Sequence, residues 1–397
     1  MKSSKRVPKQ IEKLVEPRID NALSKLPINK KPALKWFFEV TPLVVVAATA
    51  ISAFAGWYSG TGVDVLYLTG GLTIVVSILV ARTLFEHFPH VLLMISRRGV
   101  LCLPQKDVYA DDKVSSLNQI YVDFIQDAYD SMNDWREYVC GIIGVLITGW
   151  IIWLLDKNIL QQTLVNFRTP FSVYGTVLFI RLAFLMAGFV GGLIGWRILV
   201  IANTVAKLGR YFDFDLQINH PDGCGGLRPI GDLCLKLAYV TSSLPFLLGL
   251  WLVFLNFLDL RYLHMDPEDI EPLVSTIIFL TIPVAALCVF SFFFPLGSIH
   301  TCMMQAKSRL QIELDEISQE IHQLSSRLLI SANGLAPQEG TSIEQKIEFL
   351  KRVYERNGQI PTWPYRSTHI WGLISTQVIP SLGVISSIIG FIQGVGK

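Results

Sequence analysis

Long runs of apolar residues alternate with shorter polar segments along most of the chain. A helix needs about 20 predominantly apolar residues to cross the hydrocarbon core of a bilayer. The runs that approach or reach this length cover residues 40–58, 66–85, 138–155, 173–201, 237–258, 273–296 and 369–394. This pattern predicts an all-α, polytopic transmembrane helical bundle of six to seven spans, in which the last stretch either crosses the membrane or lies in its interface.

The polar segments between these runs divide the chain into regions of different character. The spans are separated by short turns or by longer polar segments, and a short turn favours antiparallel neighbours. The regions are a basic N-terminal tail (1–39), a transmembrane hairpin (40–85), an amphipathic helical segment (86–137), a transmembrane bundle (138–299) with a polar loop at 202–235, a helical hairpin (300–368) and a C-terminal apolar helix (369–397).

The polar region 300–368 has an apolar seam with alternating spacings of four and three residues. Such spacing is typical of a heptad seam between two helices. A turn near Asn333-Gly334 and a second helix from Thr341 favour a hairpin that folds on itself, with pairing between subunits as the alternative. The seam consists of Leu310, Leu314, Ile317, Ile321, Leu324 and Leu328.

Composition and charge extend this picture to localisation. Of the 397 residues, 51% are hydrophobic and 17% are charged, whereas a soluble domain has about 25% charged residues. Lys and Arg concentrate in the N-terminal tail and after every second span, which predicts a cytoplasmic N-terminus. The loop, the amphipathic segment and the hairpin then form a small cytoplasmic helical layer on a bacterial inner membrane, and the tail could also grip anionic lipid.

Two arginines and a group of glycines mark the fourth apolar run. A charge inside a span is costly and suggests function, but we place Arg181 at the outer interface and expect Arg197 to snorkel from the last turn. The glycines predict close helix packing. They are Gly188, Gly191, Gly192 and Gly195.

The polar loop contains the densest group of reactive and turn-forming residues. Its candidate functional residues are His220, Asp222, Gly223, Gly225, Gly226 and Arg228. We expect Asp222 to close a turn onto the amides that follow it, the glycines to reach positive φ, and Leu227 to anchor the loop.

Three chemical alternatives for this loop remain weaker. A metal site needs three or four matched ligands, and only His220, Asp222 and Cys224 are close in sequence. A His–Cys nucleophile pair needs hydrogen-bond reach and an orienting group. Successive glycine amides could form an anion-binding nest beside Arg228. The sequence predicts no catalytic residues, no metal, no cofactor and no enzyme, and the six cysteines lack a C-x-x-C pair.

The C-terminal half resembles uncharacterised polytopic bacterial membrane proteins. These carry a His-Pro-Asp-x-x-Gly-Gly-Leu loop between spans, a cytoplasmic helical segment and a closing Trp-Pro-Tyr/Phe motif before an apolar helix. The corresponding residues here are His220 to Leu227, residues 300–357, and Trp363-Pro364-Tyr365 followed by 369–394. The resemblance implies the same membrane architecture and brings no established activity.

Small residues on one side of the last apolar stretch suggest a packing or pore-lining helix. In lipid, helices associate where small residues let their backbones approach. The residues are Gly372, Gly383, Ser387, Gly390 and Gly394. They could face the chain's own bundle or another subunit.

These features lead to an expected function and expected partners. The sequence favours a homo-oligomeric channel or pore gated from its cytoplasmic side. The alternatives are a membrane-anchored scaffold or signalling protein that uses the helical hairpin, and a secondary transporter. The expected partners are the lipid bilayer, further copies of the chain and a cytoplasmic protein, with no nucleic acid.

Overall fold

The computed structural model describes residues 32–59, 65–102, 113–156, 170–215, 220, 222–257, 267–330, 337–358, 363–365 and 367–395. Almost all of this part is helical, and two short strands pair as a small ribbon. The helices are α2 (Pro32–Ser59), α3 (Val65–Arg97), α4 (Lys113–Met132), α5 (Arg136–Asp156), α7 (Pro170–Tyr211), α8 (Arg228–Phe257), α10 (Pro267–Ile330), α11 (Pro337–Gly358) and α12 (Ser367–Val395), and the strands are β1 (Leu101–Cys102) and β2 (Asp213–Phe214). The basic tail up to residue 31 lies outside the described residues.

Within the residues that the structure describes, seven helical segments are long and apolar enough to cross a membrane. They lie in α2, α3, α4–α5, α7, α8, α10 and α12. Apolar side chains remain exposed on the outside of the bundle, as lipid contact requires; examples are Leu43, Val76, Leu146, Leu182 and Phe279. The protein is therefore an integral membrane protein with an all-α polytopic bundle, and the predicted fold class is confirmed.

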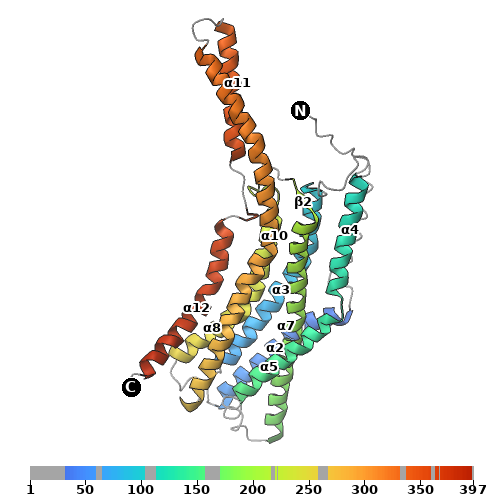
Figure 1. Ribbon diagram of the computed structural model, residues 1–397. Coiled ribbons are helices and arrows are strands. Elements are labelled where there is room, and N and C mark those ends of the chain that lie inside the picture. Colours follow the sequence, from blue (N-terminus) through green and yellow to red (C-terminus); the bar gives the residue numbers. More distant parts are fainter. Residues whose placement is uncertain are drawn as a thin grey trace.

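Two helices organise the bundle. Helix α8 contacts α3, α10 and α12, while α7 contacts α2, α5 and α10. Figure 1 shows α12 descending along α8 on one side of the bundle, and the α10–α11 hairpin standing beyond one end of it. We call this end the stalk side. Helices α3 and α7 end there, and α8 and α12 begin there.

Helix α10 does not break at the predicted boundary near residue 300. It has 64 residues, and at about 1.5 Å per residue it extends roughly 96 Å. No Gly or Pro occurs between Ser298 and Ile330, so nothing interrupts its hydrogen-bond ladder where it leaves the bundle. Helix α11 folds back on α10, and Lys346 Nζ lies 2.7 Å from Glu320 Oε1. The predicted hairpin thus consists of the far end of α10 and of α11, which packs against it. We call this hairpin the stalk.

About half of the predicted loop 202–235 is helix. Helix α7 continues to Tyr211 and α8 begins at Arg228. The extension of α7 is covered by α4, where Tyr121 and Phe124 pack on Phe212 with ring centroids 5.7 and 5.6 Å apart. Because this packing buries an apolar face outside the spans, the polar helices on the stalk side become part of the core.

Close backbone contacts join α5 to α7. A Cβ added at Gly144 would collide with the carbonyl of Gly188, and one at Gly192 would collide with the carbonyl of Cys140. The predicted close packing is therefore present at Gly188 and Gly192. Gly191 and Gly195, by contrast, have no other atom within 4 Å of an added Cβ.

The small residues of α12 face α8 of the same chain. A Cβ at Gly383 would collide with the backbone of Gly249, and one at Gly372 would lie 2.6 Å from the Tyr239 hydroxyl. Ser387 accepts a hydrogen bond of 2.7 Å from Asn256 Nδ2. These three positions therefore pack against α8 within one chain. Gly390 and Gly394 lie on α12, but their surroundings are outside the described residues.

Arg197 does not snorkel, contrary to the sequence expectation. Its Nε lies 2.8 Å from Oε1 of Glu137 in the first turn of α5, and the two side chains are 5% and 0% exposed. The rings of Phe38 and Phe85 lie 5.9 and 5.6 Å from the guanidinium carbon. Sixty positions separate the partners, so only the fold brings them together. Arg181 is exposed on the bundle surface.

The stability of the protein should depend on keeping both partners of the Arg197–Glu137 ion pair together. We expect Arg197→Met to lower the free energy of unfolding by about 3–5 kcal/mol, because it removes the opposite charge from the buried Glu137 carboxylate. Arg197→Met/Glu137→Leu should recover most of this loss, since it buries no charge. Unfolding of purified protein in sodium dodecyl sulfate, followed by tryptophan fluorescence, measures both; a double variant as unstable as the single one would contradict the prediction.

The α8–α12 contact gives a second expectation. Gly383→Leu places a side chain into the backbone of Gly249, so the protein should unfold at a lower sodium dodecyl sulfate concentration while its particle size stays the same. Ser381→Leu adds the same bulk at an exposed position of α12 and is the matched control. Light scattering after gel filtration measures the size; a smaller particle with unchanged stability would instead place Gly383 between subunits.

Candidate functional site

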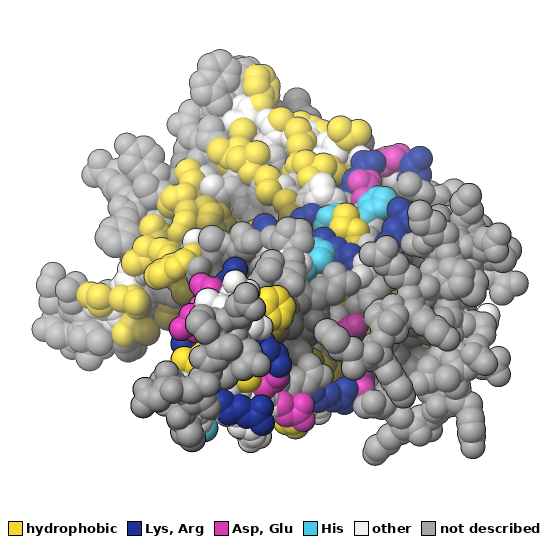
Figure 2. Space-filling view, turned by 90° about the horizontal axis from the view of Figure 1, so that it is seen from above, with side chains coloured by type: hydrophobic (Ala, Val, Ile, Leu, Met, Phe, Trp, Pro, Cys, Tyr) yellow, Lys and Arg dark blue, Asp and Glu magenta, His cyan; other side chains and the backbone are white. Residues whose placement is uncertain are grey.

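The candidate site lies at the base of the stalk, where several chain segments converge. We call this layer the collar and define it as residues 98–102, 212–215, 222–227 and 363–365, together with His220. Seen from the stalk side, Lys, Arg, Asp, Glu and His side chains gather on this face beside an apolar area (Figure 2). The collar connects the ends of α3 and α7 with the start of α8 and with the base of the stalk.

The Asp222 carboxylate holds the glycine-rich loop together. Its Oδ1 accepts hydrogen bonds from the amides of Cys224 and Gly226 at 2.8 and 3.1 Å. Its Oδ2 lies 2.8 Å from Nη1 of Arg98, which also donates to the Gly226 carbonyl at 2.7 Å. The predicted turn is therefore present, and Arg98, at the end of α3, is the partner that sequence reasoning missed.

His220 completes this arrangement. Its Nδ1 lies 3.0 Å from Oδ1 of Asp222 and accepts a hydrogen bond from the Asp222 amide at 3.3 Å. These contacts attach the imidazole to the same turn.

The environment of Asp222 favours its ionised form. Burial alone raises the pKa of this carboxyl, but the amides of Cys224 and Gly226 and the charge and hydrogen bond of His220 lower it by more. The net effect is a pKa below the usual range, so the carboxylate is ionised at neutral pH. The loop therefore keeps a negative centre to which its own amides and Arg98 are directed.

The loop glycines are required by the backbone. Gly223, Gly225 and Gly226 have φ of 67°, 65° and 94°, a region that residues with a Cβ rarely adopt. A Cβ at Gly226 would also lie 2.7 Å from Cγ2 of Val100. Leu227 is fully buried, as an anchor should be.

The strands β1 and β2 lock the collar to α7. Leu101 pairs with Phe214 and Cys102 with Asp213, and the Asp215 amide donates to the Val100 carbonyl at 2.8 Å. Burial, followed by the charges of Asp215 and Asp213, raises the pKa of the Cys102 thiol. This thiol therefore stays protonated at neutral pH.

The closing Trp-Pro-Tyr motif seats the stalk on the collar. The ring of Trp363 stacks on His300 of α10 with centroids 3.8 Å apart, and Tyr365 contacts Phe292 at 5.7 Å. A Cβ at Gly231 of α8 would collide with the Pro364 carbonyl. A further bridge joins Arg309 of the stalk to Asp213 of β2 at 3.5 Å. The stalk is therefore attached to the collar by stacking, close contact and charge.

The arrangement of the loop does not favour a nucleophile pair, an anion-binding nest or a metal site. Cys224 is 1% exposed, so its thiol is not presented to a substrate. The amides that could form an anion nest bind Asp222 instead, and Arg228 faces Asp232 at 3.7 Å. Within the described residues, no three His, Cys, Asp or Glu side chains are grouped as a metal site. The collar geometry is that of a structural joint.

The role of the loop backbone can be tested at Gly226. Gly226→Ala should open the loop, because it combines a disfavoured φ with contact on Val100. Gly226→Ala/Val100→Ala should recover part of the effect by relieving the contact alone. Thiol labelling with peptide-level mass spectrometry measures exposure of Cys224, which should label several-fold faster in the single variant; unchanged labelling would show that the loop tolerates a Cβ.

The comparisons give no relative from which to infer a role for the collar. The chain matches no known protein family, no curated protein and no solved structure. The resemblance to proteins with the His-Pro-Asp-x-x-Gly-Gly-Leu loop stays a proposal, and function must be inferred from the geometry.

Proposed function

We propose that this integral membrane protein is a membrane-anchored docking protein of the scaffold or signalling class, which presents its stalk to a helix of a soluble cytoplasmic protein. The observation that carries the proposal is the apolar seam of the stalk, which the two helices leave half-buried. The collar and the bundle then serve to hold the stalk in a fixed position.

The seam supports docking because two helices cannot enclose it. Leu314, near the base of the stalk, is buried, whereas the seam residues beyond it on α10 and those on α11 keep partial exposure. An amphipathic helix laid along such a groove would remove the remaining apolar surface from water. The half-buried residues are Ile317, Ile321, Leu324, Leu328, Ile343, Ile347 and Leu350.

The attachment of the stalk supports a positioning role. Helix α10 is continuous from its membrane segment into the stalk, and the collar holds its base through Trp363, Tyr365 and Arg309. A docked partner would therefore be held at a defined distance from the bilayer. Movement of α10 in the membrane would also be transmitted to the partner.

The charge distribution supports a cytoplasmic stalk. Arg97, Arg98, Lys207 and Arg210 lie near the stalk-side ends of α3 and α7, and Lys and Arg are enriched on the cytoplasmic side of membrane proteins. We infer that the N-terminus and the stalk face the cytoplasm, and that the membrane is a bacterial inner membrane.

The homo-oligomeric pore is the alternative proposal. The small-residue side of α12 supports it less than expected, because Gly372, Gly383 and Ser387 contact α8 within one chain. The half-buried seam of the stalk is a second surface on which copies of the chain could pair. Binding of a second copy and binding of a soluble partner predict different crosslinked products from a residue beside the seam.

Photocrosslinking from the stalk tests the proposal in native membranes. A photoreactive amino acid at Ser318 lies beside the seam, whereas one at Glu316 is separated from Ser318 by about 160° around the axis of α10; both positions are exposed. We expect Ser318 to crosslink to one soluble protein and Glu316 to give no such product.

Each other outcome points to another function. Crosslinks from Ser318 only to a second copy of the chain would favour a homo-oligomer that pairs through the stalk. Absence of any crosslink, combined with ion flux through liposomes that contain the purified protein, would favour the pore. Labelling of Ser318→Cys by an impermeant maleimide from outside intact cells would overturn the cytoplasmic orientation.

A further inference from the structure

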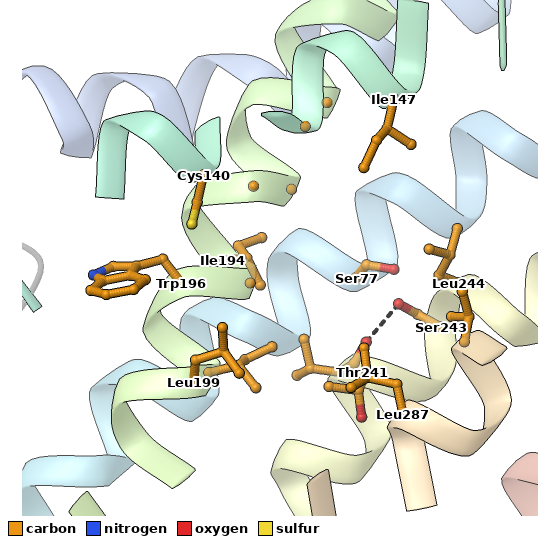
Figure 3. Close-up of a pocket in the computed structure, with 18 of the residues that line it drawn as sticks. Ser77, Cys140, Ile147, Ile194, Trp196, Leu199, Thr241, Ser243, Leu244 and Leu287 are labelled. Atoms are coloured by element: carbon orange, nitrogen blue, oxygen red, sulfur yellow. Dashed lines mark hydrogen bonds between the residues drawn. The ribbon is translucent and has the colours of Figure 1, made fainter. Parts of the chain in front are cut away.

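A second candidate site lies in the membrane part of the bundle, away from the collar. A groove of about 1100 Å³ lies between α5 and α7 on one side and α3, α8 and α10 on the other. Figure 3 shows side chains from these helices around it, including Ile147, Leu199, Leu244 and Leu287. Its volume lies slightly above the usual range of ligand pockets, which is about 300–1,000 Å³.

The floor of the groove is left open by two glycines. Gly191 and Gly195 of α7 line it and have no other atom within 4 Å of an added Cβ. Their neighbours Gly188 and Gly192 also line the groove, but an added Cβ at either would collide with α5. Open space for a Cβ is therefore found at Gly191 and Gly195.

Several hydroxyl groups in the groove already have hydrogen-bond partners within the protein. Ser77 donates to the Thr73 carbonyl at 2.6 Å, and Ser243 donates to the Val240 carbonyl at 2.7 Å. Thr241 pairs with Ser291 at 2.9 Å. Because these hydroxyls are already hydrogen-bonded, the membrane part of the groove offers mainly apolar contacts, which suit an acyl chain.

The stalk-side mouth of the groove carries charges of both signs. Lys207 Nζ lies 3.0 Å from Asp127 Oδ2, and Arg136 Nε lies 3.3 Å from Asp134 Oδ2. All four residues line the groove. The two cations and two carboxylates give this mouth no net charge, so it does not select an anionic ligand.

We propose that the groove binds a phospholipid with a phosphoethanolamine headgroup. The acyl chains lie over Gly191 and Gly195 among the apolar walls. The phosphate lies beside Lys207 and Arg136, and the primary ammonium donates hydrogen bonds to Asp127 and Asp134. An anionic headgroup brings its negative charge to this mouth without an ammonium that could donate to Asp127 and Asp134 beside their partners Lys207 and Arg136, and a choline headgroup has no N–H to donate.

The proposal does not depend on the docking function, and its test uses the full-length protein. Protein reconstituted in equal amounts of phosphatidylethanolamine, phosphatidylcholine and phosphatidylglycerol is extracted with mild detergent, and the retained lipid is identified by native mass spectrometry. We expect phosphatidylethanolamine to be retained about tenfold over the other two, the factor that a charge-assisted hydrogen bond supplies. Equal retention of the three lipids would mean ordinary bulk lipid and would overturn the proposal.

Variants separate the two parts of the site. Asp127→Asn/Asp134→Asn should remove the preference for phosphatidylethanolamine and keep the fold, because Asp127 is exposed and Asn keeps an oxygen that can accept the hydrogen bond from the Trp135 amide at position 134. Gly195→Leu fills the groove and should abolish retention of all three lipids. Gly297→Leu is the matched control, since this exposed glycine of α10 lies outside the groove and has open space around it.

The outcomes for the variants are equally decisive. An unchanged preference in the double Asn variant would overturn the headgroup assignment. Unchanged retention in Gly195→Leu would place the lipid elsewhere on the bundle. If Gly195→Leu does not fold, Gly191→Leu tests the same floor one turn away, and the wild-type measurement alone still decides whether a selective site exists.

Discussion

The buried ion pair between Arg197 and Glu137 determines how the membrane and stalk-side parts of the chain meet. It ties α7 to the first turn of α5, at the corner where α4 ends. A buried charge is tolerated only with a close partner, so this contact fixes the depth of α5 along α7. The position of α4 against the α7 extension follows from this corner, and so does the charged mouth of the groove.

Close approach of backbones sets the remaining helix positions. In lipid, apolar surface gives helices little reason to prefer one another, so contacts form where side chains are absent. Gly144, Gly188 and Gly192 bring α5 onto α7, and Gly249 and Gly383 bring α12 onto α8. Where glycines have no facing helix, as at Gly191 and Gly195, the same residue type leaves a groove.

The collar connects the helical bundle to the stalk. Asp222 joins the end of α3 to the start of α8 through Arg98 and the loop amides. Trp363 and Arg309 join the same layer to α10. The polar residues of the loop thus hold chain segments together. In the functions proposed above, the half-buried seam binds a soluble partner and the groove between the helices binds a phospholipid.

The sequence by itself determined the features that depend on local pattern. Apolar length gave the spans, heptad spacing gave the stalk seam, and the spacing of Asp222 from the glycines gave the turn, because each depends on residues close in sequence. Tertiary structure decided which faces meet. The pattern of small residues on α12 was compatible with a pore, a subunit contact or a contact within the chain. The contact of Gly383 with Gly249 of α8 is visible only in the tertiary structure. Arg98 with Asp222, and Arg197 with Glu137, are 124 and 60 positions apart. No local periodicity connects residues at such distances, since their contact is fixed by the packing of whole helices.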